Sequence, residues 1–184
     1  MTRNQVPKPR WSRVKAAVSR LDEVAFLELI RDLYGLSASN QQFVEARLGL
    51  QRDPLGPYKA IITECMYPDV FGKQPIQISN AKKAISEYRK AVRDAPGEIE
   101  LMVHFVESGN RFTLEYGDID EGFYDALLRM YDRAIKAIKD LPDSQQPAFR
   151  NRLEQIARSA HRIGWGYGDG LCDAFYSAFP ERNA

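Results

Sequence analysis

The chain has 184 residues, of which 44% are apolar and 28% are charged. This balance is typical of a globular protein and excludes the fibrous and intrinsically disordered classes. The formal net charge is only +1, but it is unevenly distributed: residues 1–20 carry six basic and no acidic side chains, and the rest of the chain carries 20 basic and 25 acidic ones.

Residues 1–20 are therefore expected to form a basic N-terminal arm that ends in a short helix, and residues 21–180 a single helical domain. No apolar run approaches the roughly 20 residues of a membrane span. No apolar signal-peptide segment follows Met1. Cys65 and Cys172 each lie in an apolar context, which is typical of unpaired thiols in a reducing compartment. Together these features predict a cytoplasmic protein.

Apolar spacing predicts an all-α, single-domain bundle of eight or nine helices in antiparallel hairpins. Ser39 or Asn40 is expected to cap the third helix, Ser79 the fifth, and Gly35 the end of the second. In chain order the helices are expected over residues 11–18, 22–34, 40–48, 54–66, 79–93, 96–116, 121–139, 143–163 and 169–179.

Two of these helices have distinctive apolar patterns. In helix 22–34 the apolar residues recur along one side, namely Val24, Phe26, Leu27, Leu29, Ile30 and Leu33. Helix 97–116 is apolar almost all round for its first three turns, which predicts a central buried helix. Gly109 lies within it at a cost of about 1 kcal/mol relative to alanine, which a close helix crossing would offset.

The helix after Ser79 is the clearest candidate for a binding surface. Five basic side chains fall within an arc of roughly 120°, opposite the apolar side chains of the same helix. The basic face is compatible with an anionic partner, such as a phosphate backbone, an acidic protein or membrane headgroups, but a solvated face that keeps the protein soluble is the simpler explanation. Its residues are Lys82, Lys83, Arg89, Lys90 and Arg93.

The segment Gly164-Trp165-Gly166-Tyr167-Gly168-Asp169-Gly170 is the most unusual in the chain. A dinucleotide-binding loop is disfavoured, because Asp169 stands at its third glycine position and no strand precedes the segment. Two interpretations remain. In one, the segment ends a helix and both aromatic rings dock on the core. In the other, His161, Trp165, Tyr167 and Asp169 line a groove.

Catalytic chemistry is not indicated. Glu100, His104 and Glu107 share a helical face, but the second Glu-x-x-His motif of a di-iron bundle is missing. A catalytic pair of Cys172 with His161 is disfavoured, because Cys172 lies among apolar neighbours, where a thiol is unreactive. We expect no catalytic residue, no metal site and no cofactor.

Short motifs in a fixed order resemble a bacterial family of small helical proteins that is known only as a domain of unknown function. The resemblance covers residues 20–180 and implies a bacterial origin, a cytoplasmic setting and an all-α fold, without an activity. Its motifs are Leu33-Tyr34, Leu36-Ser37, Phe43 with Arg47, Tyr58-Lys59, Tyr67-Pro68, Ser79, Ala81 to Ile85, Tyr116 to Asp120, Phe123-Tyr124 and Gly164 to Tyr167.

The sequence thus favours a non-catalytic helical interaction or adaptor module that binds a protein or another anionic partner of unknown identity. One alternative is an accessory nucleic-acid-binding protein that uses the basic arm and the basic helix 79–93. A second alternative is an enzyme with a site near residues 161–169. Oligomeric state is not indicated.

Overall fold

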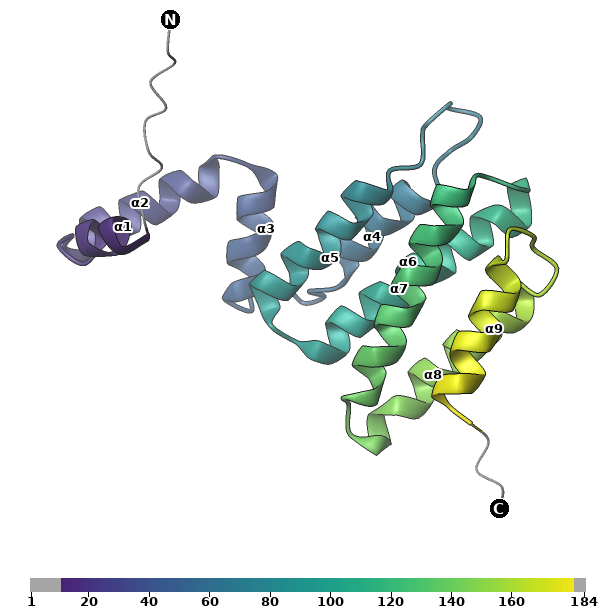
Figure 1. Ribbon diagram of the computed structural model, residues 1–184. Helices are drawn as coiled ribbons and strands as arrows, with labels where there is room; N and C mark the ends of the chain where they lie inside the picture. The colour runs from purple at the N-terminus through teal and green to yellow at the C-terminus, as the bar shows by residue number, and fades with distance from the viewer. Residues whose placement is uncertain (1–10, 181–184) are drawn as a thin grey trace, which may run out of the picture. The chain divides into compact units, whose positions relative to one another are not determined.

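The computed structural model describes residues 11–180. In this range the chain forms nine α-helices and one short 3-10 helix without a strand, which confirms the predicted all-α class (Figure 1). None of these helices is both long enough and apolar enough to cross a lipid bilayer. The helices are α1 Trp11–Val18, α2 Glu23–Gly35, α3 Ala38–Arg47, α4 Gly56–Met66, α5 Ile78–Val92, α6 Ala95–Tyr116, α7 Glu121–Lys139, α8 Gln146–Ser159 and α9 Tyr167–Ala178, with the 3-10 helix at Asp143–Gln145.

The chain divides into two compact units between residues 48 and 49. Unit 1 contains α1, α2 and α3, and unit 2 contains α4 to α9. Burial explains the division, because Ala46 is the only buried apolar residue of unit 1 in the described range. Taken by itself, unit 1 therefore has almost no hydrophobic core among the residues that the structure describes.

Unit 2 consists of three helical hairpins, α4 with α5, α6 with α7, and α8 with α9 (Figure 1). Helix α6 lies in the middle and packs against α4, α5, α7 and α8. Twelve of its 22 residues are buried, which confirms the predicted central helix. Because this helix contacts both outer hairpins, side chains far apart in the sequence meet around it.

Two details of α6 follow from its sequence. Its N-terminus is capped by Asp94, which accepts a hydrogen bond from the backbone N–H of Gly97 at 2.9 Å, and Pro96 occupies the first turn. A Cβ atom on Gly109 would lie 2.5 Å from Cδ2 of Leu127 on α7. The expected close helix crossing at Gly109 is therefore present.

Buried tyrosines join neighbouring helices, both within a hairpin and between hairpins, through their hydroxyl groups. The Tyr131 hydroxyl on α7 donates to the carbonyl oxygen of Leu153 on α8 at 2.9 Å. The Tyr124 hydroxyl lies 2.6 Å from that of Thr113 on α6. Since a buried hydroxyl without a partner costs about 1–3 kcal/mol, these bonds favour one arrangement of the helices.

Three predicted caps differ from the structure. Helix α3 is capped by Ser37, whose extended backbone lets its hydroxyl accept from the N–H of Asn40 at 3.1 Å. Ser79 lies inside α5, which begins one residue earlier and has no side-chain cap. Gly35 is the last residue of α2 and does not adopt a positive φ. In each case the helix begins or ends a residue or two from the predicted position.

Candidate functional site

The glycine segment after α8 is a structural connection rather than a groove. Tyr167 begins α9 and is fully buried, and its hydroxyl donates to Oδ1 of Asn110 on α6 at 3.3 Å. Trp165 is 58% exposed, and His161 and Asp169 are also exposed. Of the two interpretations, docking on the core holds for the ring of Tyr167 and not for the exposed ring of Trp165, and Tyr167 does not line an open groove.

The glycines of this segment have distinct roles. Gly166 has a φ of +69°, a conformation that a side chain disfavours, whereas a Cβ atom there would meet no neighbour. A Cβ atom on Gly168 would collide with the carbonyl oxygen of Ala160, so the start of α9 passes directly against the end of α8. Trp165 also has a positive φ, +61°, which is unusual for a bulky residue that buries little of its ring.

The predicted basic face lies on α5, and all five of its residues are exposed. Carboxylates neutralise part of it. The Lys83 ammonium lies 3.7 Å from Glu87, and the Arg89 guanidinium lies 3.9 Å from Glu98. Glu98 also binds Arg133 of α7 at 2.6 Å. The face is therefore a mixed-charge surface, which weakens its attraction for a polyanion.

A polar network joins α4, α6 and α8 on the outside of the core. Arg152 of α8 donates two hydrogen bonds to Glu107 of α6, at 2.7 and 2.6 Å, and a third to Glu100. The Lys59 ammonium of α4 lies 2.6 Å from the other oxygen of Glu100. His104, between the two carboxylates on α6, hydrogen-bonds through Nε2 to the Thr63 hydroxyl of α4 at 2.8 Å.

The network lowers the pKa of one of its carboxylates and of its histidine. Burial raises the pKa of Glu100, but the hydrogen bonds from Arg152 and Lys59 outweigh it, so this pKa is lowered. Burial, together with the nearby Lys59 charge, lowers the pKa of His104. The sequence placed Glu100, His104 and Glu107 on one face but missed their cationic partners, which come from other helices.

The network is a cluster of ion pairs between helices. The oxygens of Glu100 and Glu107 are engaged by Arg152 and Lys59, which occupy the positions that a cation would take. Within residues 11–180, no group of three or more histidine, cysteine, aspartate or glutamate side chains is placed to hold a metal ion. The contacts therefore stabilise the packing of three helices.

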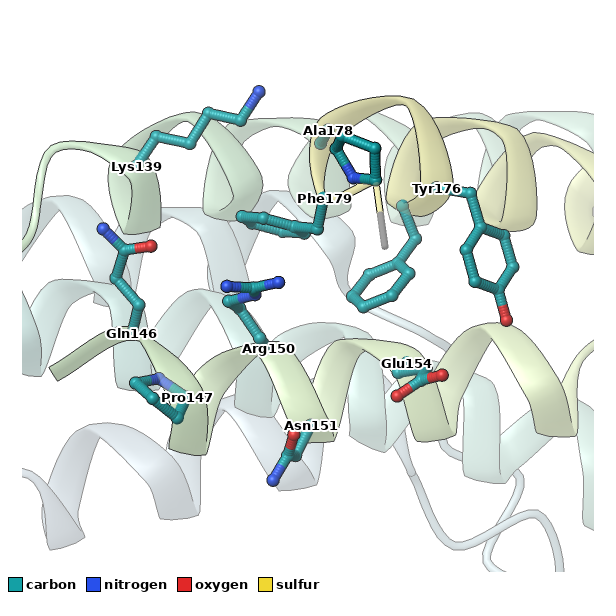
Figure 2. Close-up of a pocket in the computed structure, with 11 residues that line it drawn as sticks. Lys139, Gln146, Pro147, Arg150, Asn151, Glu154, Tyr176, Ala178 and Phe179 are labelled. Carbon is teal, nitrogen blue, oxygen red and sulfur yellow. The ribbon is translucent and has the colours of Figure 1, made fainter. Parts of the chain in front are cut away.

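A pocket lies between α8 and α9, at their junction with the end of α7 (Figure 2). Its volume is about 640 Å³, and the sequence did not indicate it. The Arg150 guanidinium of α8 lies 4.6 Å from the centre of the Phe179 ring, and the Lys139 ammonium of α7 lies 5.8 Å from it. The remaining lining residues are Gln146, Pro147, Asn151, Glu154, Phe175, Tyr176, Ala178 and Pro180.

The charged residues that line the pocket are two cations and one carboxylate, namely Lys139, Arg150 and Glu154. Its one acidic lining residue, Glu154, binds Arg158 on the same helix at 2.5 Å. Arg150 and Lys139 have no carboxylate partner among residues 11–180, and they lie on opposite sides of the Phe179 ring (Figure 2). Two cations beside aromatic rings suit a small anion that carries an apolar or planar group.

Most of the exposed large apolar side chains of the described chain lie in unit 1. In α2, Phe26, Leu29, Ile30 and Leu33 follow the i, i+3, i+4, i+7 spacing of a buried stripe, yet no residue of α1 or α2 is buried. Unit 1 contains 11 of the 17 large apolar side chains exposed within residues 11–180. We call these the unit 1 apolar surface: Trp11, Val14, Leu21, Val24, Phe26, Leu27, Leu29, Leu33, Leu36, Phe43 and Leu48.

Unit 1 nevertheless has defined internal contacts between α2 and α3. The Tyr34 hydroxyl donates to Glu45 at 2.6 Å, and the side-chain amide of Asn40 donates to the carbonyl oxygen of Leu33 at 2.6 Å. The Asp22 side chain caps α2 by accepting from the N–H of Ala25 at 2.8 Å. These bonds fix the helices locally but cover little apolar area.

Of the six basic residues of the predicted arm, three lie within the described residues and three lie outside them. Arg13, Lys15 and Arg20 lie on or just after α1 and are exposed. Arg3, Lys8 and Arg10 lie outside the described residues.

Comparisons of the chain with family models, with curated proteins and with solved structures found no match. The resemblance to a bacterial family of unknown function therefore stays a prediction.

Proposed function

We propose that this protein is a non-catalytic helical interaction module whose partner-binding surface is the unit 1 apolar surface. The observation that carries the proposal is that α1 and α2, 21 residues of well-formed helix, contain no buried residue. Short helices gain most of their stability by packing an apolar face. A stripe left uncovered in this way is typical of a surface that another protein covers.

The interaction surface thus differs from the basic helix that the sequence favoured. Ion pairs with Glu87 and Glu98 give α5 a mixed charge, and the large ring of Tyr88 is buried against Tyr58. Without exposed aromatic or amide groups near the cations, any binding of nucleic acid to this helix would be non-specific. We therefore favour a protein over nucleic acid as the partner. A cytoplasmic setting and the resemblance to the bacterial family are part of the same proposal.

Site-specific photo-crosslinking tests the proposal in the full chain. A photoreactive amino acid at position 27, where Leu27 is 58% exposed, should form adducts with protein inside cells. The matched control carries the same group at exposed Lys82 on α5 and should form few. Reaction at position 82 alone, or adducts that nuclease removes, would contradict the proposal.

A second candidate function, binding of a small anion in the α8–α9 pocket, is favoured by the two cations held on one phenylalanine ring. Calorimetric titration with benzoate or phenyl phosphate tests it. Heat of binding should appear with the wild type and be lost in Arg150→Ala. Arg129→Ala, which removes an exposed cation of α7 that does not line the pocket, is the control. Equal heats in all three proteins would exclude the site.

A further inference from the structure

We infer that the α8–α9 pocket binds a small zwitterion, of which an α-amino acid with an apolar side chain is the simplest kind. The inference rests on the second candidate function, the binding of a small anion, and adds a site for a positively charged group of the same ligand. All the residues involved belong to unit 2. They are Arg150 and Glu154 of α8, Lys139 of α7 and the aromatic side chains of α9.

Two groups of opposite charge line the pocket one helical turn apart on α8. Arg150 and Glu154 are both partly buried, and residues at this spacing commonly form an ion pair on a helix surface. Here they do not pair with each other. The Arg150 guanidinium lies 4.6 Å from the centre of the Phe179 ring, and Glu154 binds Arg158. Figure 2 shows Arg150 reaching towards Phe179 and Glu154 one turn further along α8.

Both groups keep hydrogen-bonding capacity. The Arg150 guanidinium offers several N–H donors in a planar fork, and no carboxylate among residues 11–180 binds it. Arg158 donates to Oε1 of Glu154 at 2.5 Å, and Oε2 accepts no hydrogen bond from the described part of the chain. A carboxylate accepts several hydrogen bonds, so this second oxygen can bind an ammonium group. The pocket therefore offers donors and an acceptor within one helical turn.

An α-amino acid matches this pair of groups. Its carboxylate and its ammonium are attached to the same carbon atom, so one molecule can reach both Arg150 and Glu154. A guanidinium binds a planar carboxylate through two parallel hydrogen bonds. The ammonium is a compact donor and suits the free oxygen of Glu154. The side chain, which leaves the same carbon atom, then lies against α9.

The α9 side of the pocket is aromatic. The centre of the Phe175 ring lies 5.3 Å from those of both Tyr176 and Phe179. Phe175 and Phe179 are almost fully buried, so the core holds these two rings in place. The pocket volume of about 640 Å³ falls within the range of roughly 300–1,000 Å³ that is typical of small-molecule sites. The wall therefore suits an apolar side chain, and an aromatic one best.

The arrangement of charge disfavours ligands with two negative charges. Lys139 and Arg150 lie on opposite sides of the Phe179 ring, so they do not converge on one phosphate group (Figure 2). A second negative group on the other side of Arg150 would be repelled by the carboxylate of Glu154. A single carboxylate with a neighbouring ammonium is therefore favoured over a phosphate ester or a dicarboxylate.

Calorimetric titration of the full chain at neutral pH compares three probes that differ by one group. Free phenylalanine carries both charged groups, phenylpropanoate lacks the ammonium, and phenethylamine lacks the carboxylate. Phenylalanine should bind the wild type at least about tenfold more tightly than either of the others, since each missing group removes a hydrogen bond between charged partners.

Glu154→Gln tests the ammonium site. The variant should bind phenylalanine about tenfold more weakly than the wild type does, with the affinity of phenylpropanoate. Its affinity for phenylpropanoate should not fall, which also shows that the pocket is folded. Asp125→Asn is the matched control, because it removes the charge of a half-exposed acid of α7 that does not line the pocket. It should bind all three probes as the wild type does.

The outcomes separate this inference from the second candidate function. The zwitterion site is overturned if phenylpropanoate binds the wild type as tightly as phenylalanine does. It is also overturned if Glu154→Gln weakens the binding of both ligands equally or of neither. In these cases the anion site stands. If neither phenylalanine nor phenylpropanoate binds, or if phenethylamine binds as tightly as phenylalanine, both proposals fail.

Discussion

Replacing Gly168 with alanine should force a side chain into the backbone of the preceding helix. The new Cβ would collide with the carbonyl oxygen of Ala160 and lie 3.1 Å from Cα of His161. Backbone atoms cannot rotate away as the end of a flexible side chain can, so α8 and α9 would have to separate. Such overpacking costs typically about 1–3 kcal/mol, and we expect about 2 kcal/mol for Gly168→Ala.

Two glycines of the same segment supply matched controls. Gly166→Ala meets no neighbour but places a side chain at a φ of +69°, which costs about 1 kcal/mol. Gly164→Ala meets no neighbour and has no positive φ, so its effect should stay within about 0.5 kcal/mol. Alanine at positions 164, 166 and 168 should therefore be progressively more destabilising.

Urea unfolding followed by far-UV circular dichroism measures the order. If the slope of the unfolding free energy against urea is unchanged, the midpoints report stability directly. A Gly168→Ala midpoint equal to that of Gly164→Ala would refute the close passage of α9 over the end of α8. A Gly166→Ala midpoint equal to that of Gly164→Ala would refute the left-handed backbone.

Three further variants test other parts of the structure. His104 has a folded-state pKa below its usual 6.5, so the unfolded chain takes up the proton first as the pH falls. The contribution of His104 to stability should be complete above about pH 6.5 and be lost as the pH drops through the folded-state pKa. His104→Gln should therefore flatten that part of a profile of urea midpoint against pH. Arg152→Met leaves the carboxylate of Glu107 without its two hydrogen bonds and should cost about 2 kcal/mol in urea unfolding. Arg129→Met, which breaks an exposed pair with Asp125 one helical turn apart, should change stability little. Trp165→Asn should not lower the melting temperature, because asparagine tolerates the positive φ of that position and the exposed indole contributes little packing; a marked loss in calorimetry would mean that the indole holds the loop.

The helices themselves follow from local sequence. The span 121–139 agrees with the structure at both ends, because Asp120 caps its first turn and apolar residues recur at helical spacing up to residue 138. The central position of α6 also followed from the sequence. A helix that is apolar nearly all round has no face for water, so other helices must surround it.

Packing alone decided which apolar residues are covered. Helices α2 and α7 both carry an apolar stripe, but that of α7 is buried between α6 and α9, while that of α2 stays exposed. Tyr167 and Trp165 are two residues apart, yet one ring is in the core and the other in solvent. Helical periodicity specifies which side of a helix is apolar, and it does not specify what lies opposite.

The polar sites depended on tertiary structure for the same reason. Arg152 meets Glu100 from 52 residues away, and Lys139 and Arg150 meet at Phe179 from three different segments. Sequence spacing places residues on a common face only within one helix, whereas these contacts join separate helices. The sequence therefore determined the helices and the central one among them. The tertiary structure decided the ion-pair network, the α8–α9 pocket and the uncovered surface of unit 1, because each depends on which helices become neighbours.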